Sequence, residues 1–437
     1  MQKAKLKRSF KNIYSNITEL ISRQDFIDRH RRSEKDFTRD RKLTFNRLIM
    51  FSLNQLKSSL QDELDKFFQV LGLSNHGESY VSKAALCKAR NKLEPSAFIE
   101  LNHNSLDSFY THFPVQEKWY GFRLLAVDGS KVELPNSDEI REIFGVHNSS
   151  DRPMGLLSSL YDLNNRLWLD AELVPLSKGE REVAAGHLEF TKEDDLLLYD
   201  RGYPAFWLFA LHRHKNRNFC MRLPYNLYNE SADLYFSDDE QERIVTLFPD
   251  RNAKQMCLAQ GISSDPITIR LIKVELDSGQ LEILATSLLD TELYPENVFG
   301  NLYHERWGHE EGYKLLKIPA ELQNWTGKRS KTLFQDLHAK LLTLNLAAMQ
   351  AAAAQIQVNK KTKHRKHRYQ INRSQSLSRM KDFVINILDS VDPRARIRQL
   401  ISITAKNIEP VRPGRKYPRN PRLGVGIRYK AAYKRGR

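Results

Sequence analysis

Apolar residues recur at helical spacing through the first hundred residues of the chain. Between Phe45 and Phe68 they fall three or four positions apart, which predicts one long amphipathic helix capped by Thr44. A break rich in Gly, Ser and Asn follows, and residues 82–93 then predict a shorter helix that Ser82 caps. Residues 1–120 are therefore expected to form a helical N-terminal domain that binds DNA or packs as an ordinary bundle.

Beyond Gly121 the pattern changes to short apolar runs, rich in branched residues and separated by turn residues, which is typical of strands. Three such runs come first, and strands then alternate with helical patterns. The predicted strands are 123–127, 156–161, 167–176, 196–199 and 219–223, and the predicted helices are 180–190 and 205–214. Consecutive strands followed by alternating strands and helices predict a mixed α/β sheet.

Helical signals vanish between residues 224 and 290, which predicts a mainly β segment. Within it, runs at 267–274 and 281–289 flank the turn residues Asp277, Ser278 and Gly279 and predict a hairpin.

Helical spacing returns over residues 295–318 and 331–357, where an Ala-rich run has high helix propensity. The whole pattern predicts an α/β domain over 121–357 with a β insertion at about 224–295. Residues 358–437 remain as a basic C-terminal region.

The net charge of the chain limits the classes of molecule that it is expected to bind. There are 69 Lys and Arg against 53 Asp and Glu, so the net charge is +16 and the pI is near 9.5. Such a field attracts polyanions, and nucleic acid is the leading partner class. An anionic membrane surface is the rival, but no apolar run approaches about 18 residues and no signal peptide opens the chain. The sequence predicts a soluble, cytoplasmic protein.

Basic residues without acids gather in three segments: 1–12, 360–368 and 411–437. Segments of this composition usually stay outside a core, and the first is expected to be a solvated arm. The three cysteines Cys87, Cys220 and Cys257 are scattered, which excludes a CxxC zinc site and favours ordinary buried thiols.

The helix over residues 82–93 carries Lys83, Lys88 and Arg90 after a helix and a break. This order resembles a helix-turn-helix, whose second helix enters the major groove of DNA. A solvated face on an ordinary helical bundle explains the same residues. Both interpretations stay open, and the three side chains are candidate DNA contacts.

Two predicted strands end in an aspartate that small residues follow. Asp128 closes the run Leu125–Val127 before Gly129, and Asp200 closes a second apolar run before a Gly turn. A carboxylate at a strand end projects from a rigid element, and the adjacent glycine lets a phosphate backbone approach. Asp-Gly is also a common turn pair, so either residue alone is ordinary. Two of them side by side could share a hard cation.

A third candidate lies in the helix predicted over 295–318. Five residues fall on one face of this helix: Tyr303, Arg306, Glu310, Lys314 and Lys317. An acid flanked by bases on one stripe could bind a metal and the phosphates around it, whereas a surface ladder of ion pairs is the alternative. A zinc-protease motif is excluded, because His304 and His309 are five positions apart rather than four.

Tyr303, Arg306, Glu310 and Lys317 have the Y-(2)-R-(3)-E-(6)-K spacing of bacterial insertion-sequence transposases. Together with Asp128 and Asp200, this sequence resembles the DDE transposases of the "insertion sequence four" family. The resemblance implies a ribonuclease-H-like core with a β insertion before the glutamate helix. It also implies cut-and-paste transposition by a dimer that binds terminal inverted repeats.

The resemblance further implies roles for single residues. Asp128, Asp200 and Glu310 would be the catalytic carboxylates and the ligands of two Mg²⁺ ions, with Mn²⁺ as a substitute, while Tyr303, Arg306 and Lys317 would contact DNA phosphates. Water would first cut the transposon strand, and the freed 3′-OH would then attack the opposite strand or target DNA.

One departure from the family leaves a step open. Some relatives use a Trp to hold a flipped base where residues 281–284 are Leu-Glu-Ile-Leu here, so the sequence does not say whether the ends pass through a hairpin. A non-catalytic basic DNA-binding protein and an inactive domesticated transposase are the rival interpretations.

Overall fold

The computed structural model describes residues 2–54, 57–76, 78–113, 118–146, 152–276, 279–318, 320–381, 383–390 and 392–412. The chain divides into two compact units. The helical unit comprises Met1–Val115, Val132–Met154 and Lys314–Arg437, and the sheet unit comprises Gln116–Lys131 and Gly155–Tyr313.

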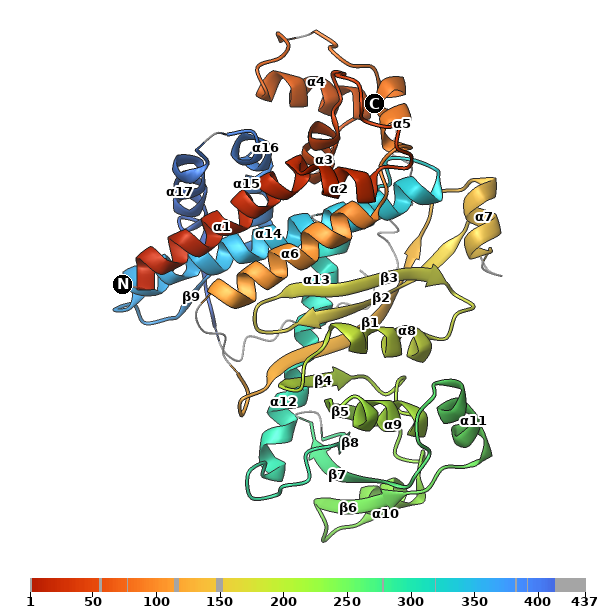
Figure 1. The fold of residues 1–437 in the computed structure, drawn as a ribbon. Coiled ribbons are helices and arrows are strands. Elements are labelled where there is room, and N and C mark those ends of the chain that lie inside the picture. The colour runs from red at the N-terminus through yellow and green to blue at the C-terminus, as the bar shows by residue number, and fades with distance from the viewer. Residues whose placement is uncertain are drawn as a thin grey trace. The chain divides into compact units, whose positions relative to one another are not determined.

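An eight-stranded mixed sheet has the strand order β3-β2-β1-β4-β5-β8-β7-β6 (Figure 1). Its strands are β1 Arg123–Glu133, β2 Met154–Asp162, β3 Leu167–Pro175, β4 Asp195–Tyr199, β5 Asn218–Leu223, β6 Glu242–Leu247, β7 Ile267–Glu275 and β8 Leu281–Thr286. The predicted mixed α/β class and all of the predicted strands are confirmed, including the hairpin of β7 and β8.

The sheet combines parallel strands at its centre with antiparallel pairs on both sides. β1, β4 and β5 are parallel, because their registers pair Leu125 with Leu197 and Leu197 with Phe219. The pairs β2–β3, β5–β8, β8–β7 and β7–β6 are antiparallel. Strands of a parallel sheet have continuous apolar sequences, because both of their faces are covered. Accordingly, all five residues of β4 are buried.

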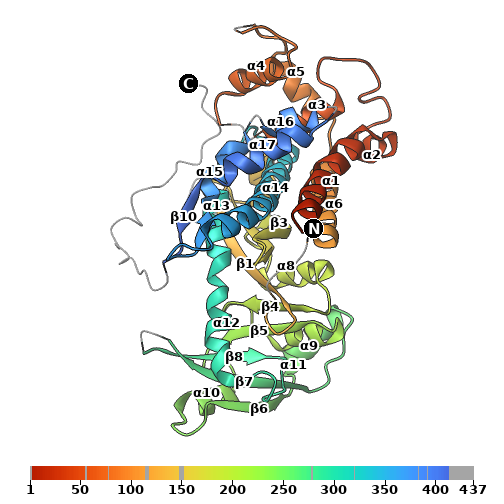
Figure 2. The same ribbon diagram turned by 90° about the vertical axis from the view of Figure 1, so that its left-hand side faces the viewer.

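Helices cover both faces of this sheet. On one face lie α8 Glu180–Gly186, α9 Phe206–His214 and α11 Arg251–Ala259, and on the other lie α10 Asn229–Phe236 and α12 Phe299–Glu305 (Figures 1 and 2). The 3₁₀ turns η1 His187–Phe190 and η2 Glu296–Val298 extend α8 and precede α12.

The prediction that helices vanish between residues 224 and 290 is wrong, because α10 and α11 lie there. Both are short, and local capping stabilises them better than their periodicity suggests. Asp250 caps α11 by accepting a hydrogen bond from the backbone N–H of Ala253 at 2.6 Å.

Two helices expected to be continuous are interrupted. The long N-terminal helix is divided into α3 Phe45–Leu53 and α4 Leu60–Val70, since Ser59 caps a new helix by accepting from Asp62 N–H. The predicted caps Thr44 and Ser82 are confirmed. The helix with the Tyr-Arg-Glu-Lys spacing is divided at Arg306 into α12 and α13 Trp307–Lys317.

The helical unit is built around α14, a helix of 33 residues over Ser330–Thr362 (Figure 2). Helices α1 Gln2–Ser22, α3, α6 Ser96–His112, α15 Arg373–Met380 and α17 Arg394–Thr404 pack against it. Its remaining elements are α2 Gln24–His30, α5 Lys83–Arg90, α7 Asp138–Phe144, α16 Phe383–Leu388, and the strand pair β9 Tyr369–Ile371 and β10 Ile408–Pro410.

Helix α14 is long and apolar enough, by length and composition, to cross a membrane. The sequence prediction that no such stretch exists is therefore wrong. However, 67% of its apolar window is buried inside the protein, which is how a core helix satisfies the same test.

The three basic segments differ in their structure. From Gln2 onward, the backbone of the N-terminal segment forms the start of α1. Residues 360–362 end α14, and residues 413–437 lie outside the described residues. Cys220 and Cys257 are buried free thiols as predicted, whereas Cys87 is exposed.

Candidate active site

Asp128 and Asp200 come at equivalent positions along two neighbouring parallel strands. Asp200 directly follows β4, as predicted, whereas the prediction that Asp128 ends its strand is wrong, because β1 continues to Glu133. The register of β1 and β4 pairs Ala126 with Leu198, and each aspartate follows two residues later. Neighbouring strands lie about 4.8 Å apart, so the sheet places the two carboxylates at the same edge. Rigid buried strands hold both backbones, since residues 124–127 and 195–199 are all buried.

Arg306 connects Asp128 to Glu310. Its guanidinium lies 3.9 Å from Asp128 Oδ2 and 3.8 Å from Glu310 Oε1. The Asp128 side chain is 21% exposed and that of Glu310 is 39% exposed, so a ligand can reach both carboxylates. The neighbouring acids Glu305 and Glu311 are exposed to solvent.

The electrostatics of Asp128 are unusual for an aspartate. The pKa of Asp128 is raised to about 6, chiefly by burial, with smaller contributions from the carboxylates of Asp200 and Glu180, while Arg306 and the backbone N–H of Gly129 oppose the rise. A carboxyl group with a raised pKa beside other acids is a site where the protein alone does not balance the negative charge.

Glu180 is an acid of this site that the sequence prediction missed. It opens α8, and its Oε1 lies so close to Gly129 that a Cβ built there would be 1.9 Å away. Burial raises the pKa of Glu180, and the charge of Asp200 adds to the effect. Glu180 sits 20 residues before Asp200 with no strand-end motif of its own, so only the folded sheet brings it to Asp128.

Tyr303 and Arg306 are buried rather than displayed on a surface stripe. They are 6% and 9% exposed, and the guanidinium of Arg306 lies 5.7 Å from the centre of the Tyr303 ring. Among the described residues, neither the Tyr303 hydroxyl nor Arg306 Nε has a hydrogen-bond partner. Burial raises the pKa of Tyr303 well above its ordinary value, so the hydroxyl keeps its proton and can donate it.

The two lysines of the helix lie in its last turns. Lys314 is exposed and Lys317 is half-buried in α13, one and two turns beyond Glu310. They belong to the helical unit.

The N-terminal candidates have contrasting environments. Lys83 and Lys88 are exposed on α5, as a DNA contact requires. Arg90 is 5% exposed, and its guanidinium donates to Asp336 at 2.7 Å and to Gln335 at 2.9 Å. The interpretation of Arg90 as a DNA contact is therefore wrong, because α14 provides its partners and buries its charge.

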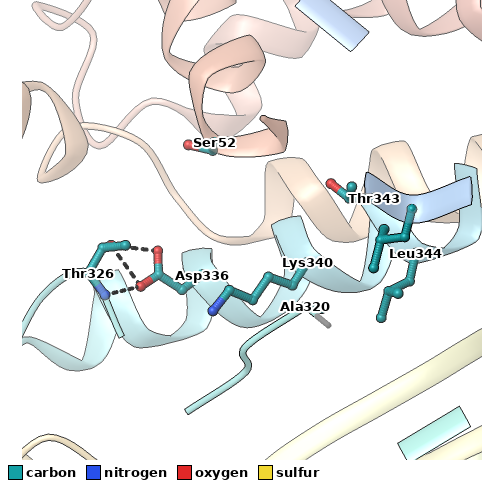
Figure 3. A pocket seen from close by; sticks show the side chains of 8 residues that line it. Ser52, Ala320, Thr326, Asp336, Lys340, Thr343 and Leu344 are labelled. Atoms are coloured by element: carbon teal, nitrogen blue, oxygen red, sulfur yellow. Dashed lines mark hydrogen bonds between the residues drawn. The ribbon is translucent and has the colours of Figure 1, made fainter. Parts of the chain in front are cut away.

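The partners of Arg90 border a small cavity in the helical unit (Figure 3). Asp336 accepts hydrogen bonds from the backbone and hydroxyl of Thr326, and Lys340 donates to the carbonyl oxygen of Glu321 at 2.7 Å. Burial lowers the pKa of Lys340 to about 8. These groups satisfy one another, which is the arrangement of a structural network.

Acids near the strand start are structural as well. Asp195 is fully buried and accepts two hydrogen bonds of 2.7 Å from Arg123, its register partner in β1. Asp194 forms an exposed ion pair with Lys118. Neither is available as a ligand, so Asp200 is left as the functional candidate of β4.

The donor atoms of the site suit a hard cation, because carboxylate oxygens are the ligands that such ions prefer. Within the described residues, no three His, Cys, Asp or Glu side chains lie close enough to hold a metal as they stand. The guanidinium of Arg306 lies within 4 Å of both Asp128 and Glu310.

Comparison with known proteins identifies the class. Residues 119–346, more than half of the chain, match the family described as "Transposase DDE domain". The chain belongs to this family, and the match begins just before β1 and includes Asp128, Asp200 and Glu310.

Particular relatives agree with this class. The transposase InsG of insertion sequence element IS4 from Escherichia coli strain K12 is 26% identical over 286 residues, which are 62% of this chain and 61% of InsG. InsZ from the same organism, which also carries a transposase name, is 24% identical over 38% of this chain and 58% of its own length. The chain thus spans about three fifths of each relative, and the resemblance to insertion-sequence transposases is confirmed.

A solved structure of the piggyBac transposase synaptic complex with hairpin DNA is also similar. It has a TM-score of 0.44 and 11% sequence identity, and the likeness covers 95% of this chain and 87% of that one.

Proposed function

We propose that this chain is the transposase of an insertion sequence, which cuts DNA at the ends of its element and joins the freed 3′-OH to target DNA. The observation that carries the proposal is the arrangement around Arg306. Asp128 of β1 and Asp200, which directly follows the neighbouring strand β4, each come two residues after the register pair of Ala126 and Leu198. Arg306 lies within 4 Å of both Asp128 and Glu310.

Asp128, Asp200 and Glu310 would hold two Mg²⁺ ions, with Mn²⁺ as a substitute. The raised pKa of Asp128 supports this role, since a divalent cation would relieve the repulsion among the carboxylates. When bound, the ions would activate the attacking oxygen and stabilise the leaving oxygen of an in-line displacement at phosphorus.

Arg306 and Tyr303 would bind the phosphates beside the cut. Both carry a buried donor without a partner among the described residues, and a phosphate oxygen would satisfy it. Lys314 and Lys317 would extend these contacts along α13, and Lys83 and Lys88 of α5 would bind DNA as well. The charge of Arg306 would then move from the carboxylates toward the DNA, which would leave room for the cations.

We further propose that the core is ribonuclease-H-like. The strand run β3-β2-β1-β4-β5 supports this, because an antiparallel pair is followed by parallel strands that present the two aspartates at one edge. The segment from α10 to β8 would be the insertion before the glutamate helix.

The partners follow from the same proposal. The protein would act as a dimer on the terminal inverted repeats and on target DNA, in a nucleoid-associated, cytoplasmic location. The net charge of +16 supports binding to double-stranded DNA.

A paired substitution tests the function. Glu310→Gln removes the charge of the proposed ligand, whereas Glu311→Gln changes an exposed neighbour about 100° round the helix. With DNA fragments from the two flanks of the gene, Glu310→Gln should bind like the wild type but lose Mg²⁺-dependent nicking. Glu311→Gln should retain nicking, and EDTA should abolish it in both wild type and control.

Two results would overturn the proposal. Nicking by Glu310→Gln would show that the glutamate is not a ligand. Binding of the flanking DNA by a wild-type protein that cuts neither strand in Mg²⁺ or Mn²⁺ would make the chain a DNA-binding protein without catalysis.

A further inference from the structure

A chain of buried hydrogen bonds joins the glutamate helix to the strand that carries Asp128. Ser159 of β2 places its Oγ 3.0 Å from His309 Nε2 and 2.8 Å from Tyr313 Oη. Tyr313 Oη lies 3.0 Å from the carbonyl oxygens of Asp128 and of Leu157. Ser159 and His309 are fully buried and Tyr313 is 7% exposed, so water does not compete for these bonds.

The number of available protons determines which group donates and which accepts in each of these hydrogen bonds. A neutral imidazole has one N–H, and His309 Nδ1 has no partner among the described residues. Placing the proton on Nε2 lets His309 donate to Ser159, Ser159 donate to Tyr313, and Tyr313 donate to the carbonyl oxygen of Asp128. The other tautomer would bury an unpaired N–H and draw the proton of Tyr313 toward Ser159, away from Asp128.

Aromatic packing restricts the same side chains. The ring of His309 stacks on Tyr161 at 5.1 Å with an interplanar angle of 2°, and on Tyr313 at 4.9 Å. Gly312 permits this packing, because a Cβ there would lie 3.0 Å from the Tyr161 ring. Packed rings hold single rotamers, so the hydroxyl of Tyr313 has a fixed position.

We propose that Ser159, His309 and Tyr313 are positioning residues that set the separation of Asp128 and Glu310. His309 directly precedes Glu310, and Tyr313 follows it by three residues and ends its bond on the main chain of Asp128. One hydrogen-bonded path therefore joins the backbones of two catalytic residues. The inference rests on the proposed function. It explains how α13, a helix beside the sheet, keeps Glu310 at a fixed position relative to Asp128.

The strand β2 offers a matched control. Ser158, the neighbour of Ser159, also bonds a buried histidine, with Oγ 3.0 Å from His187 Nε2. Successive side chains of a strand point to opposite faces, so this second bond lies on the face away from α13. Ser158→Ala and Ser159→Ala each remove one buried Ser-His bond of the same length.

The test compares Tyr313→Phe, Ser159→Ala and Ser158→Ala in the full chain. For Tyr313→Phe, single-turnover nicking of flank DNA by Mg²⁺ should slow by about 100-fold, since misplacement by about 1 Å has that effect. Ser159→Ala should slow nicking by about 10-fold, or roughly 1.4 kcal/mol in the barrier. DNA affinity should stay within about twofold of wild type in all three. Ser158→Ala should lower Tm as much as Ser159→Ala yet nick at the wild-type rate.

A second measurement does not depend on cleavage. In calorimetric titration with Mn²⁺ and no DNA, Tyr313→Phe should bind the ion at least several-fold more weakly than wild type, whereas Ser158→Ala should bind it equally. Wild-type Mn²⁺ affinity in a folded Tyr313→Phe would overturn the inference, as would equal loss of nicking in the two serine variants. A wild-type protein that never nicks would refute the proposed function, and the Mn²⁺ titration would still decide this inference.

Discussion

Asp128 carries a negative charge in a place where the protein alone stabilises it poorly. Burial raises its pKa to about 6, and Asp200 and Glu180 add to the rise. A carboxylate selected only for stability would be paired or exposed, as Asp195 and Asp194 are. The unfavourable charge of Asp128 is therefore better explained by a cationic ligand than by folding.

Asp128→Asn should stabilise the metal-free protein at neutral pH. The folded-state pKa of about 6 exceeds the ordinary 3.8, so the contribution of Asp128 is fully present below pH 4 and is lost as pH rises through 6. The Asn side chain has no proton to lose in this pH range. The free energy of unfolding of the variant should therefore exceed that of the wild type by up to about 3 kcal/mol at pH 8. Urea unfolding in EDTA at pH 8 and pH 4 measures this, and equal stabilities at pH 8 would contradict it.

Whereas the charge of Asp128 destabilises the fold, the buried charge of Arg90 stabilises it. Arg90→Ala leaves Asp336 buried without its cation, which should lower the free energy of unfolding by about 3–5 kcal/mol. The double variant Arg90→Met, Asp336→Leu should recover only part of this loss, because it removes both charges of the pair but also takes the nearby carboxylate away from the buried Lys340. Denaturant unfolding measures both. Replacing exposed Lys83 and Lys88 by Ala should instead leave stability nearly unchanged and weaken DNA binding. If Arg90→Ala weakened DNA binding without loss of stability, Arg90 would be a DNA contact after all.

At the scale of elements, the sequence predicts what depends on local patterns. Continuous apolar runs identified β1, β4 and β5 and the aspartates that follow the first two runs, although β1 continues past Asp128 to Glu133. The burial of Arg90 was not predictable, because Asp336 lies 246 positions away in sequence. Glu180 opens α8 and reaches Gly129 beside Asp128 only through the tertiary fold, which no local pattern encodes. The break at Arg306 was also missed, since the apolar spacing continues across it.

Two glycines of α13 allow its packing to be tested. A Cβ at Gly312 would lie 3.0 Å from the Tyr161 ring and 3.3 Å from the Trp168 ring, whereas at Gly308 it would lie 3.3 Å from a methyl group of Leu163. Gly308→Ala should be neutral or stabilise by up to about 1 kcal/mol through helix propensity.

Gly312→Ala should instead destabilise by about 1–3 kcal/mol, because stacked rings cannot shift easily. Thermal unfolding of the two variants measures the contrast. If both alanines raise Tm equally, α13 is not held against β2 and β3 as tightly as these distances indicate.

At the scale of the whole molecule, charge is distributed unevenly along the chain. The candidate site gathers the acids Asp128, Glu180, Asp200 and Glu310, while residues 413–437 contain nine of the 69 Lys and Arg residues and no acid. An acidic centre repels DNA in the absence of cations, so the attraction has to come from elsewhere on the chain. We expect the basic C-terminal segment to supply part of this attraction.

The basic C-terminal segment should dominate the salt dependence of DNA binding. Every phosphate that the protein neutralises adds about 0.9 to the steepness of log K against log salt. Deletion of residues 413–437 should therefore reduce the slope by up to about 8 if all nine cations bind phosphates, and should weaken binding of flank DNA and of unrelated DNA alike. Titrations between about 50 and 200 mM salt measure the slope. Because Asp128, Asp200 and Glu310 are unchanged, cleavage at saturating DNA should proceed at the wild-type rate. An unchanged slope would assign the attraction to Lys83, Lys88 and the other bases of the described residues.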